Sequence, residues 1–198
     1  MSASINFVTT NNGKKAWLKR EFDALGMTVD IICQPVVLIE PQADTFAEVS
    51  VSKVKQAYPI IGKPVIAEDG GFSIPALNGF PGVYSKYVIQ TIGNQGFLKL
   101  LEGKNRKAYF TTSASFYDGQ TLKTFERKIE GSVALREAEK NSDKAWSELW
   151  KIFIPDGYKK TLAEMNETEL NDYQKKQTQS SLGDFAVWYC DRIKNVDF

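Results

Sequence analysis

The sequence predicts a mixed α/β fold, and two patterns along its 198 residues indicate this class. Segments typical of strands and helices alternate over the first part of the chain, as in folds that cover a sheet with helices. Further along, residues 107–117 and 121–135 are rich in aromatic and β-branched side chains and flank Asp118-Gly119, which is typical of a β-hairpin. We expect a single domain over residues 1–198, with no separable linker, that buries a substantial core.

Each strand is predicted from an apolar or β-branched run, and each helix from apolar side chains that recur every three or four residues. Gly26 and Pro59 mark the ends of the first two helices. In chain order, these patterns predict strand 4–9, helix 14–25, strand 27–38, helix 45–58, strand 64–67, helix 85–101, hairpin strands 107–117 and 121–135, a turn at 153–158, and helices near 161–178 and 183–194.

Composition excludes several classes of protein. The formal net charge of +1 offers no broad basic surface for nucleic acid. No apolar run approaches the length of a membrane span and the first residues lack the features of a signal peptide, so we expect a cytoplasmic protein without membrane contact. The chain contains no histidine, which excludes Ser-His-Asp catalysis and an imidazole-ligated zinc site. Acid–base chemistry must therefore use carboxylates, lysines, tyrosines or metal-bound water.

An acidic pair followed by glycines is the strongest functional signal in the chain. Glu68 and Asp69 directly follow the predicted strand at residues 64–67, so we expect both carboxylates to emerge at a strand end. Adjacent carboxylates suit Mg²⁺, which takes oxygen ligands and keeps waters and substrate phosphates in its shell. The same residues are also typical of an ordinary turn, so the interpretation needs a partner elsewhere in the chain.

The loop at residues 9–14 offers that partner. It joins a strand to a helix N-terminus and ends in Lys14. Helix N-termini attract phosphate through free N–H groups and the helix dipole. An ordinary helix cap is an equally good interpretation of this segment taken alone.

Together, three windows closely resemble the inosine triphosphate pyrophosphatase family, which removes deaminated purine nucleoside triphosphates. The windows are Thr-x-Asn-x-Gly-Lys at 9–14, Glu-Asp-x-Gly at 68–71 and Ala-Leu-x-Gly-x-Pro-Gly-x-Tyr-Ser-Lys-Tyr at 76–87. The resemblance implies an elongated, two-lobed mixed α/β fold with a central twisted mixed sheet, the nucleotide in a cleft between the lobes, and a homodimer. It also implies Mg²⁺-dependent hydrolysis between the α and β phosphates of a nucleoside triphosphate substrate, which yields nucleoside monophosphate and pyrophosphate.

The resemblance assigns roles to individual residues. Asp69 would bind Mg²⁺ and activate the water, with Glu68 assisting the metal and Lys14 taking part in catalysis. The residues expected to bind substrate are Thr9, Asn11, Gly13, Lys14, Lys53, Gly70, Ser85, Lys86 and Trp150.

Several positions depart from the family pattern. A further metal-binding glutamate falls on Pro41, which leaves Glu40 beside it, or Asp44, to replace it. The serine that usually follows the central aspartate is Gly70.

The positions that read the base depart as well. Residues 147–151 and 181–186 lack the family's aromatic-Asp and His-Arg pairs. Trp150 would either stack on the base or lie in the core, and Glu148 or Asp184 would contact the base edge.

The lead interpretation is therefore a Mg²⁺-dependent nucleoside triphosphate pyrophosphatase that clears aberrant purine nucleotides such as ITP, dITP and XTP but has a remodelled base pocket. Two alternatives stay open at this point. One is a catalytically impaired nucleotide-binding or interaction protein with the same fold. The other is a pyrophosphatase for a modified nucleotide or for another nucleoside diphosphate-linked compound.

Overall fold

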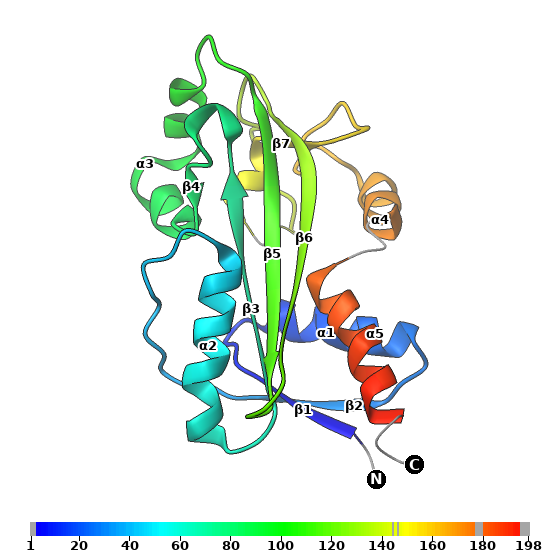
Figure 1. Cartoon of the computed structure of the whole chain (residues 1–198). Coiled ribbons are helices and arrows are strands. Elements are labelled where there is room, and N and C mark those ends of the chain that lie inside the picture. Colours follow the sequence, from blue (N-terminus) through cyan, green and yellow to red (C-terminus); the bar gives the residue numbers. More distant parts are fainter. Residues whose placement is uncertain (1–2, 144, 146, 177–179, 195–198) are drawn as a thin grey trace. The chain divides into compact units, whose positions relative to one another are not determined.

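A computed structural model describes residues 3–143, 145, 147–176 and 180–194 (Figure 1). The strands within these residues are β1 (Ala3–Phe7), β2 (Val29–Cys33), β3 (Val65–Ser73), β4 (Pro81–Gly82), β5 (Lys107–Tyr117), β6 (Leu122–Val133) and β7 (Phe153–Pro155). The α-helices are α1 (Asn12–Ala24), α2 (Phe46–Ile61), α3 (Ser85–Leu100), α4 (Glu167–Lys176) and α5 (Ser181–Lys194), with short 3₁₀ helices over Pro75–Leu77 and Glu148–Lys151. None of the described helices is long and apolar enough to span a bilayer.

The strands form a mixed sheet in the order β2-β1-β3-β5-β6-β7, with β4 paired to β3. β1 lies parallel to β2 and β3, whereas β3 and β4, and β6 and β7, run antiparallel. The predicted mixed α/β class with a central mixed sheet is confirmed. The hairpin around Asp118-Gly119 is also confirmed, because β5 ends just before these residues and β6 begins just after them.

The chain divides into two compact units, which we describe separately. The first unit comprises residues 1–70, 112–127 and 179–198, and the second comprises residues 71–111 and 128–178. The expectation of one undivided domain is not decided by this division and stays a prediction.

In the first unit, the side chains of β3 alternate between two apolar clusters. Ile66 packs in a cluster with Phe7, Leu18 and Phe22, which joins the sheet to α1 and α5. These two helices lie side by side in Figure 1. Val65 and Ala67 point the other way, into a cluster with Val54 and Ala57 of α2. The sequence alternation of β3 therefore places α1 and α2 against opposite sides of the same strand.

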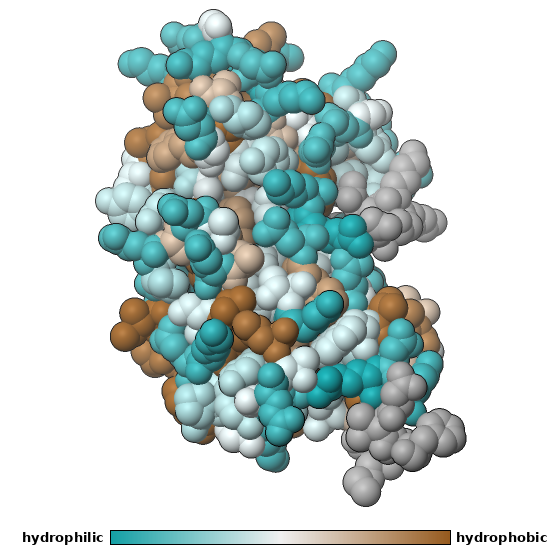
Figure 2. Space-filling model, in the orientation of Figure 1, coloured by the Kyte–Doolittle hydropathy of each residue, from teal (hydrophilic) through white to brown (hydrophobic). Residues whose placement is uncertain are grey.

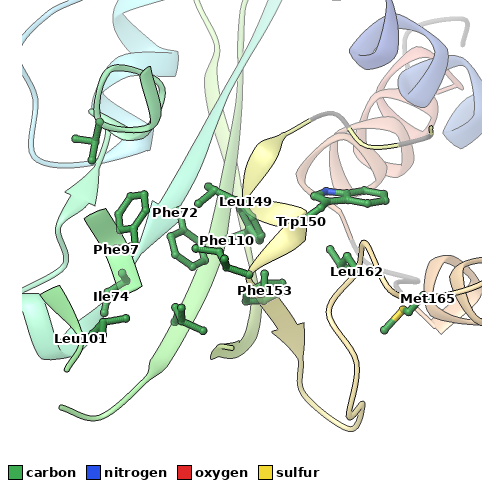
Figure 3. Packing of buried hydrophobic residues seen from close by; sticks show 14 of the residues in the cluster. Phe72, Ile74, Phe97, Leu101, Phe110, Leu149, Trp150, Phe153, Leu162 and Met165 are labelled. Atoms are coloured by element: carbon green, nitrogen blue, oxygen red, sulfur yellow. The ribbon is translucent and has the colours of Figure 1, made fainter. Parts of the chain in front are cut away.

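The second unit has an aromatic core centred on Phe72, which is fully buried. The Phe72 ring centroid lies 6.0 Å from that of Phe97, 4.9 Å from that of Phe110 and 5.8 Å from that of Phe153. Tilted and edge-on rings at such distances are favourable beyond the burial of their area. Figure 3 shows this cluster together with Leu149, Trp150, Leu162 and Met165.

The strand predicted over residues 27–38 is shorter than expected and ends at Cys33. Gln34 N still donates to Phe7 O at 3.0 Å, but Pro35 follows and has no N–H to continue the ladder. Residues 34–45 therefore form a loop without regular structure between β2 and α2.

Two predicted helix boundaries are also wrong. α2 continues through Pro59 to Ile61 and ends at Gly62, whose φ of 67° suits glycine. Pro59 therefore lies in the last turn of α2 instead of marking its end. α4 begins at Glu167 and not near residue 161, because Asn166 Oδ1 accepts from Glu169 N at 2.9 Å as a helix cap. Residues 177 and 178 of the predicted helix lie outside the described residues.

The predicted turn at residues 153–158 begins with a strand. β7 occupies Phe153–Pro155 and pairs with β6, so only the residues after it turn. α5 begins two residues before its predicted start, at Ser181.

Candidate active site

The two acidic residues lie within β3 and not at a strand end, which corrects the prediction. β3 continues from Val65 through both carboxylates and the following glycines to Ser73. Consecutive side chains of a strand point to opposite faces. Glu68 is consequently on the side of Ile66 and α1, and Asp69 is on the side of Ala67 and α2.

Each carboxylate meets a lysine from the helix on its own side. Glu68 Oε2 lies 2.6 Å from Lys14 Nζ of α1, and Asp69 Oδ1 lies 2.7 Å from Lys53 Nζ of α2. The structure therefore brings together the four charged residues that the motifs singled out in the first unit. It also separates them into two pairs, which the linear sequence did not indicate.

The Glu68 carboxylate is the more buried of the two. Its side chain is 7% exposed, whereas that of Asp69 is 19% exposed. Lys14 Nζ also donates to the Glu68 backbone carbonyl at 3.1 Å. The ammonium group of Lys14, 2.6 Å from Glu68 Oε2, supplies the opposite charge that a buried carboxylate requires.

Lys53 lies between two carboxylates. Its Nζ is 2.8 Å from Glu40 Oε1 as well as 2.7 Å from Asp69 Oδ1. Burial alone lowers the pKa of Lys53, but attraction to Asp69 and Glu40 outweighs it and raises that pKa above its usual value. The lysine is thus held in its charged form, which suits a group that binds an anion.

The loop before α1 forms a helix cap. Thr9 Oγ1 accepts from Asn11 N at 3.0 Å, and Asn11 Oδ1 accepts from Gly13 N at 2.8 Å and from Lys14 N at 3.4 Å. A Cβ at Gly13 would stand 3.0 Å from Asn11 Oδ1, which explains why the smallest residue suits this position. These hydrogen bonds connect the four residues predicted to bind phosphate here, Thr9, Asn11, Gly13 and Lys14. The Asn11 side chain thereby accepts from two of the N–H groups at this helix end.

The residues fit a divalent cation by their donor chemistry, but they do not form a ready-made cage. Among the described residues there is no group of three or more His, Cys, Asp or Glu side chains arranged to hold a metal ion. Mg²⁺ does not require one, because it usually binds through one or two carboxylates together with waters and substrate phosphates. Asp69 and Glu40, which both lie beside Lys53, supply hard oxygen ligands of this kind. Participation of Glu68 in the same metal site stays a prediction.

Gly70 follows Asp69 within β3, whereas Ser85 and Lys86 belong to the second unit. Ser85 Oγ accepts from Phe72 N at 2.7 Å and donates to Gly82 O at 2.6 Å, which ties the start of α3 to β3 and β4 within that unit. Lys86 is exposed on the first turn of α3. Binding of substrate by Gly70, Ser85 and Lys86 stays a prediction.

Trp150 lies in the core of the second unit. It is 4% exposed and packs in the cluster that includes Leu162 and Met165 (Figure 3). Of the two predicted alternatives for Trp150, a place in the core and stacking on the base, the structure agrees with the first. Its contact with a base stays a prediction.

The acids considered for the base edge have protein partners. Arg127 of β6 donates to both oxygens of Asp184, from Nη2 to Oδ1 at 3.0 Å and from Nε to Oδ2. The hydrogen bond to Asp184 raises the pKa of Arg127. Glu148 Oε2 lies 3.6 Å from Lys151 Nζ. Arg127 was missed because it is 57 positions from Asp184 and belongs to no motif.

The chain resembles known proteins in sequence and in fold. The model of the Ham1 family matches residues 5–178. A dITP/XTP pyrophosphatase of Thermococcus kodakarensis is 38% identical over 189 residues, which cover 95% of this chain and 98% of the relative. A dITP/XTP pyrophosphatase of Saccharolobus solfataricus is 42% identical over 139 residues, 70% of each chain. The structure of a HAM1 protein from Coxiella burnetii superposes with a TM-score of 0.80 at 23% identity and covers 96% of this chain and 99% of that chain.

Proposed function

Because this chain belongs to the Ham1 family, we propose that it is a nucleoside triphosphate pyrophosphatase, a hydrolase that acts on acid anhydrides. The relatives named dITP/XTP pyrophosphatases support this activity, since they match this chain at 38% and 42% identity. The resemblance predicted from the motifs at 9–14 and 68–71 is confirmed. The proposed substrates are aberrant purine nucleotides such as dITP, XTP and ITP, and removal of these compounds is a house-cleaning role.

The single observation that carries the proposal is the pair of lysine–carboxylate contacts on opposite sides of β3. Lys14 and Lys53 place two ammonium groups beside the acids of one strand. A triphosphate is a polyanion that can draw both ammonium groups away from their present partners. The carboxylates then become available to a metal ion and to water.

We assign the roles as follows. Lys14 and Lys53 hold phosphate oxygens and offset the negative charge that develops as the bond between the α and β phosphates breaks. Asp69 orients and deprotonates the attacking water, which gives nucleoside monophosphate and pyrophosphate. Thr9, Asn11 and Gly13 present the N-terminus of α1 to the phosphates.

Asp69 and Glu40, which both lie beside Lys53, would hold Mg²⁺, the divalent cation that suits carboxylate ligands and a phosphate substrate. Glu68 would assist from the other side of β3, where it pairs with Lys14. When bound, such an ion polarises phosphoryl oxygens and lowers the pKa of water. In keeping with the family resemblance, we place the enzyme in the cytoplasm as a homodimer.

We also propose that the base pocket is remodelled. The support is that Gly183 stands where the family carries arginine, and that a Cβ there would lie 3.1 Å from Glu21 Oε2. A side chain at this position would therefore require small shifts of Ser180 Oγ, 3.0 Å away, and of the Glu21 carboxylate, which accepts from Trp17 Nε1 at 2.5 Å.

The test is a screen of pyrophosphate release from dITP, XTP, ITP and the four ordinary deoxynucleoside triphosphates, with Mg²⁺ and with EDTA. We expect Mg²⁺-dependent release of pyrophosphate, and a loss of at least about a hundredfold in kcat for Asp69→Asn, because this variant keeps the shape of the side chain but cannot act as a base. Binding without turnover of any nucleotide would favour a nucleotide-binding protein instead. Full activity of Asp69→Asn would show that Asp69 does not deprotonate the attacking water.

A further inference from the structure

The loop between β2 and α2 carries Glu40 and is held against α2 by alternating side chains. Val36 and Leu38 pack against the cluster that contains Val54 and Ala57 of α2, whereas Val37 and Ile39 are 97% and 79% exposed. Figure 2 shows hydrophobic side chains at the surface on the left of the view, where Figure 1 draws this loop. The segment is therefore extended, with a side-chain period of two.

This alternation determines where the next side chain goes. Glu40 follows Ile39 and falls on the same side as Val36 and Leu38, toward α2. Its Oε1 lies 2.8 Å from Lys53 Nζ, although the Glu40 side chain is 72% exposed. Ion pairs with an exposed partner contribute at most about 1 kcal/mol, because holding two long side chains in one geometry costs entropy. Hydrogen bonds to the backbone of the loop give its end further order.

Gln56 provides that order. Its Oε1 accepts from Ile39 N at 2.9 Å, and its Nε2 donates to Ile39 O at 2.8 Å, so one carboxamide satisfies both polar groups of one residue. Nε2 also donates to Ser52 Oγ at 3.0 Å, a further contact within α2. Gln56 lies one helical turn after Lys53, on the same face of α2. It therefore ties the residue before Glu40 to the helix that carries the partner of Glu40.

We infer that Gln56 is a positioning residue that holds the Glu40 carboxylate beside Lys53 and Asp69, where Glu40 supports binding of the divalent cation. This inference rests on the proposed function, since that function assigns Glu40 to the cation. Partners that orient a metal-binding side chain commonly change metal affinity by about ten- to a hundredfold when they are removed. Gln56 has no proposed contact with the substrate phosphates or with the attacking water. Its effect on the cation is therefore expected to pass through Glu40 alone.

The experiment compares Gln56→Ala, and Gln56→Met as a second variant of preserved length, with the wild-type protein. We expect the Mg²⁺ concentration that gives half-maximal pyrophosphate release from dITP to rise about tenfold, while kcat at saturating Mg²⁺ changes less than about twofold. Ser52→Ala is the matched control, because it removes one contact of Gln56 but keeps both bonds to Ile39. It should leave the half-saturating Mg²⁺ concentration unchanged.

A double-mutant comparison separates positioning from a general effect on the fold. In a Glu40→Gln background, Gln56→Ala should have no further effect on the half-saturating Mg²⁺ concentration, because the carboxylate that it positions is gone. An equal rise in both backgrounds, or no rise in the wild-type background, would overturn the positioning role.

Direct binding of Mn²⁺, followed by electron paramagnetic resonance, gives a readout that does not depend on turnover. We expect weaker Mn²⁺ binding by Gln56→Ala than by the wild-type protein, and the same binding by Ser52→Ala. If the wild-type protein releases no pyrophosphate from any nucleotide, the proposed function fails, and this measurement still decides Gln56. Equal dissociation constants for wild type and Gln56→Ala would overturn the inference.

Discussion

Lys53 Nζ lies 2.7 Å from Asp69 Oδ1, so the lysine proposed to bind phosphate and the acid proposed to activate water are ion-paired with each other. The side chains of Lys53 and Asp69 are only 14% and 19% exposed, and such a pair is stable only while both charges keep a partner. In the proposed reaction, a nucleotide with its cation would satisfy this condition, because phosphate would replace Asp69 beside the lysine and the cation would replace the lysine beside Asp69. We therefore expect substrate binding to exchange the charged partners of both residues.

The first prediction concerns Lys53→Met, which keeps the length of the side chain and removes its charge. Hydrogen bonds to charged groups contribute about 1.5–3 kcal/mol, so we expect kcat/KM for dITP to fall about ten- to a hundredfold. Lys55→Met is the control, because Lys55 is an exposed lysine on the same helix. Steady-state kinetics of both variants measure this change. Equal decreases of kcat/KM in Lys53→Met and Lys55→Met would argue against a specific role for Lys53.

The second prediction concerns pH and the end of the loop that carries Glu40. Glu48 Oε2 accepts from the backbone N–H groups of Thr45 and Asp44, each at 3.0 Å. These hydrogen bonds, with the one from Thr45 first in size, lower the pKa of Glu48. Since the folded pKa is depressed, this stabilisation is present above the unfolded pKa of about 4.3 and is lost as the pH falls through the folded value.

We therefore expect Glu48→Gln to lower the urea midpoint of unfolding by a constant amount between pH 6 and pH 8. The difference from wild type should shrink as the pH falls below the unfolded pKa of about 4.3, because the unfolded chain then binds a proton on Glu48 more readily than the folded protein does. Glu102→Gln, on the turn after α3, makes the same change of net charge and serves as the control. A gap between wild type and Glu48→Gln that stays constant down to pH 3 would contradict the assignment.

The charged residues of the candidate site in the first unit could be predicted because three spaced motifs indicated a family, and the resemblance to that family assigned them roles. Lys14, Lys53, Glu68 and Asp69 are all brought into contact as two pairs. Their arrangement on opposite sides of a strand could not be predicted, because Gly70 and the glycine after it read as a turn and concealed that β3 continues. Had the strand been extended past Ala67, a period of two would have indicated the separation.

Other parts of the site have no signal in the linear sequence. Gln56 contacts a residue 17 positions away, and Arg127 contacts one 57 positions away. A glutamine on a helix and an arginine on a strand are ordinary surface residues until tertiary structure supplies their partners. Similarly, the helix boundary at Glu167 depends on the Asn166 cap, which the expected helix over 161–178 passed over.

The third prediction concerns Asp184, which was considered as a contact for the base edge. Both of its oxygens accept from Arg127. We expect Asp184→Asn to leave the ratio of kcat/KM for dITP to that for dATP unchanged within about twofold, because the carboxylate is already committed to the protein. The pair is partly exposed, with side chains 40% and 27% exposed, so the loss of stability should be under about 1 kcal/mol. A tenfold change in the ratio would instead assign Asp184 to the base.

The fourth prediction concerns Gly131, where β6 pairs with β7 opposite Pro155. A Cβ at this position would stand 2.3 Å from Ile154 O and 2.6 Å from Phe153 Cζ. Neither neighbour can withdraw easily, because one is backbone and the other is a fully buried ring whose centroid is 4.8 Å from that of Phe110.

Gly131→Ala should therefore lower the free energy of unfolding by about 1–3 kcal/mol, the usual cost of an overpacked core. Urea unfolding followed by tryptophan fluorescence measures this loss. Ser132→Ala, the adjacent change on the same strand, adds no atom to the core and should alter the free energy of unfolding by less than about 0.5 kcal/mol. If Gly131→Ala were as stable as Ser132→Ala, β7 would have room to shift, and the close packing of Phe153 against β6 would not be a constraint on the fold.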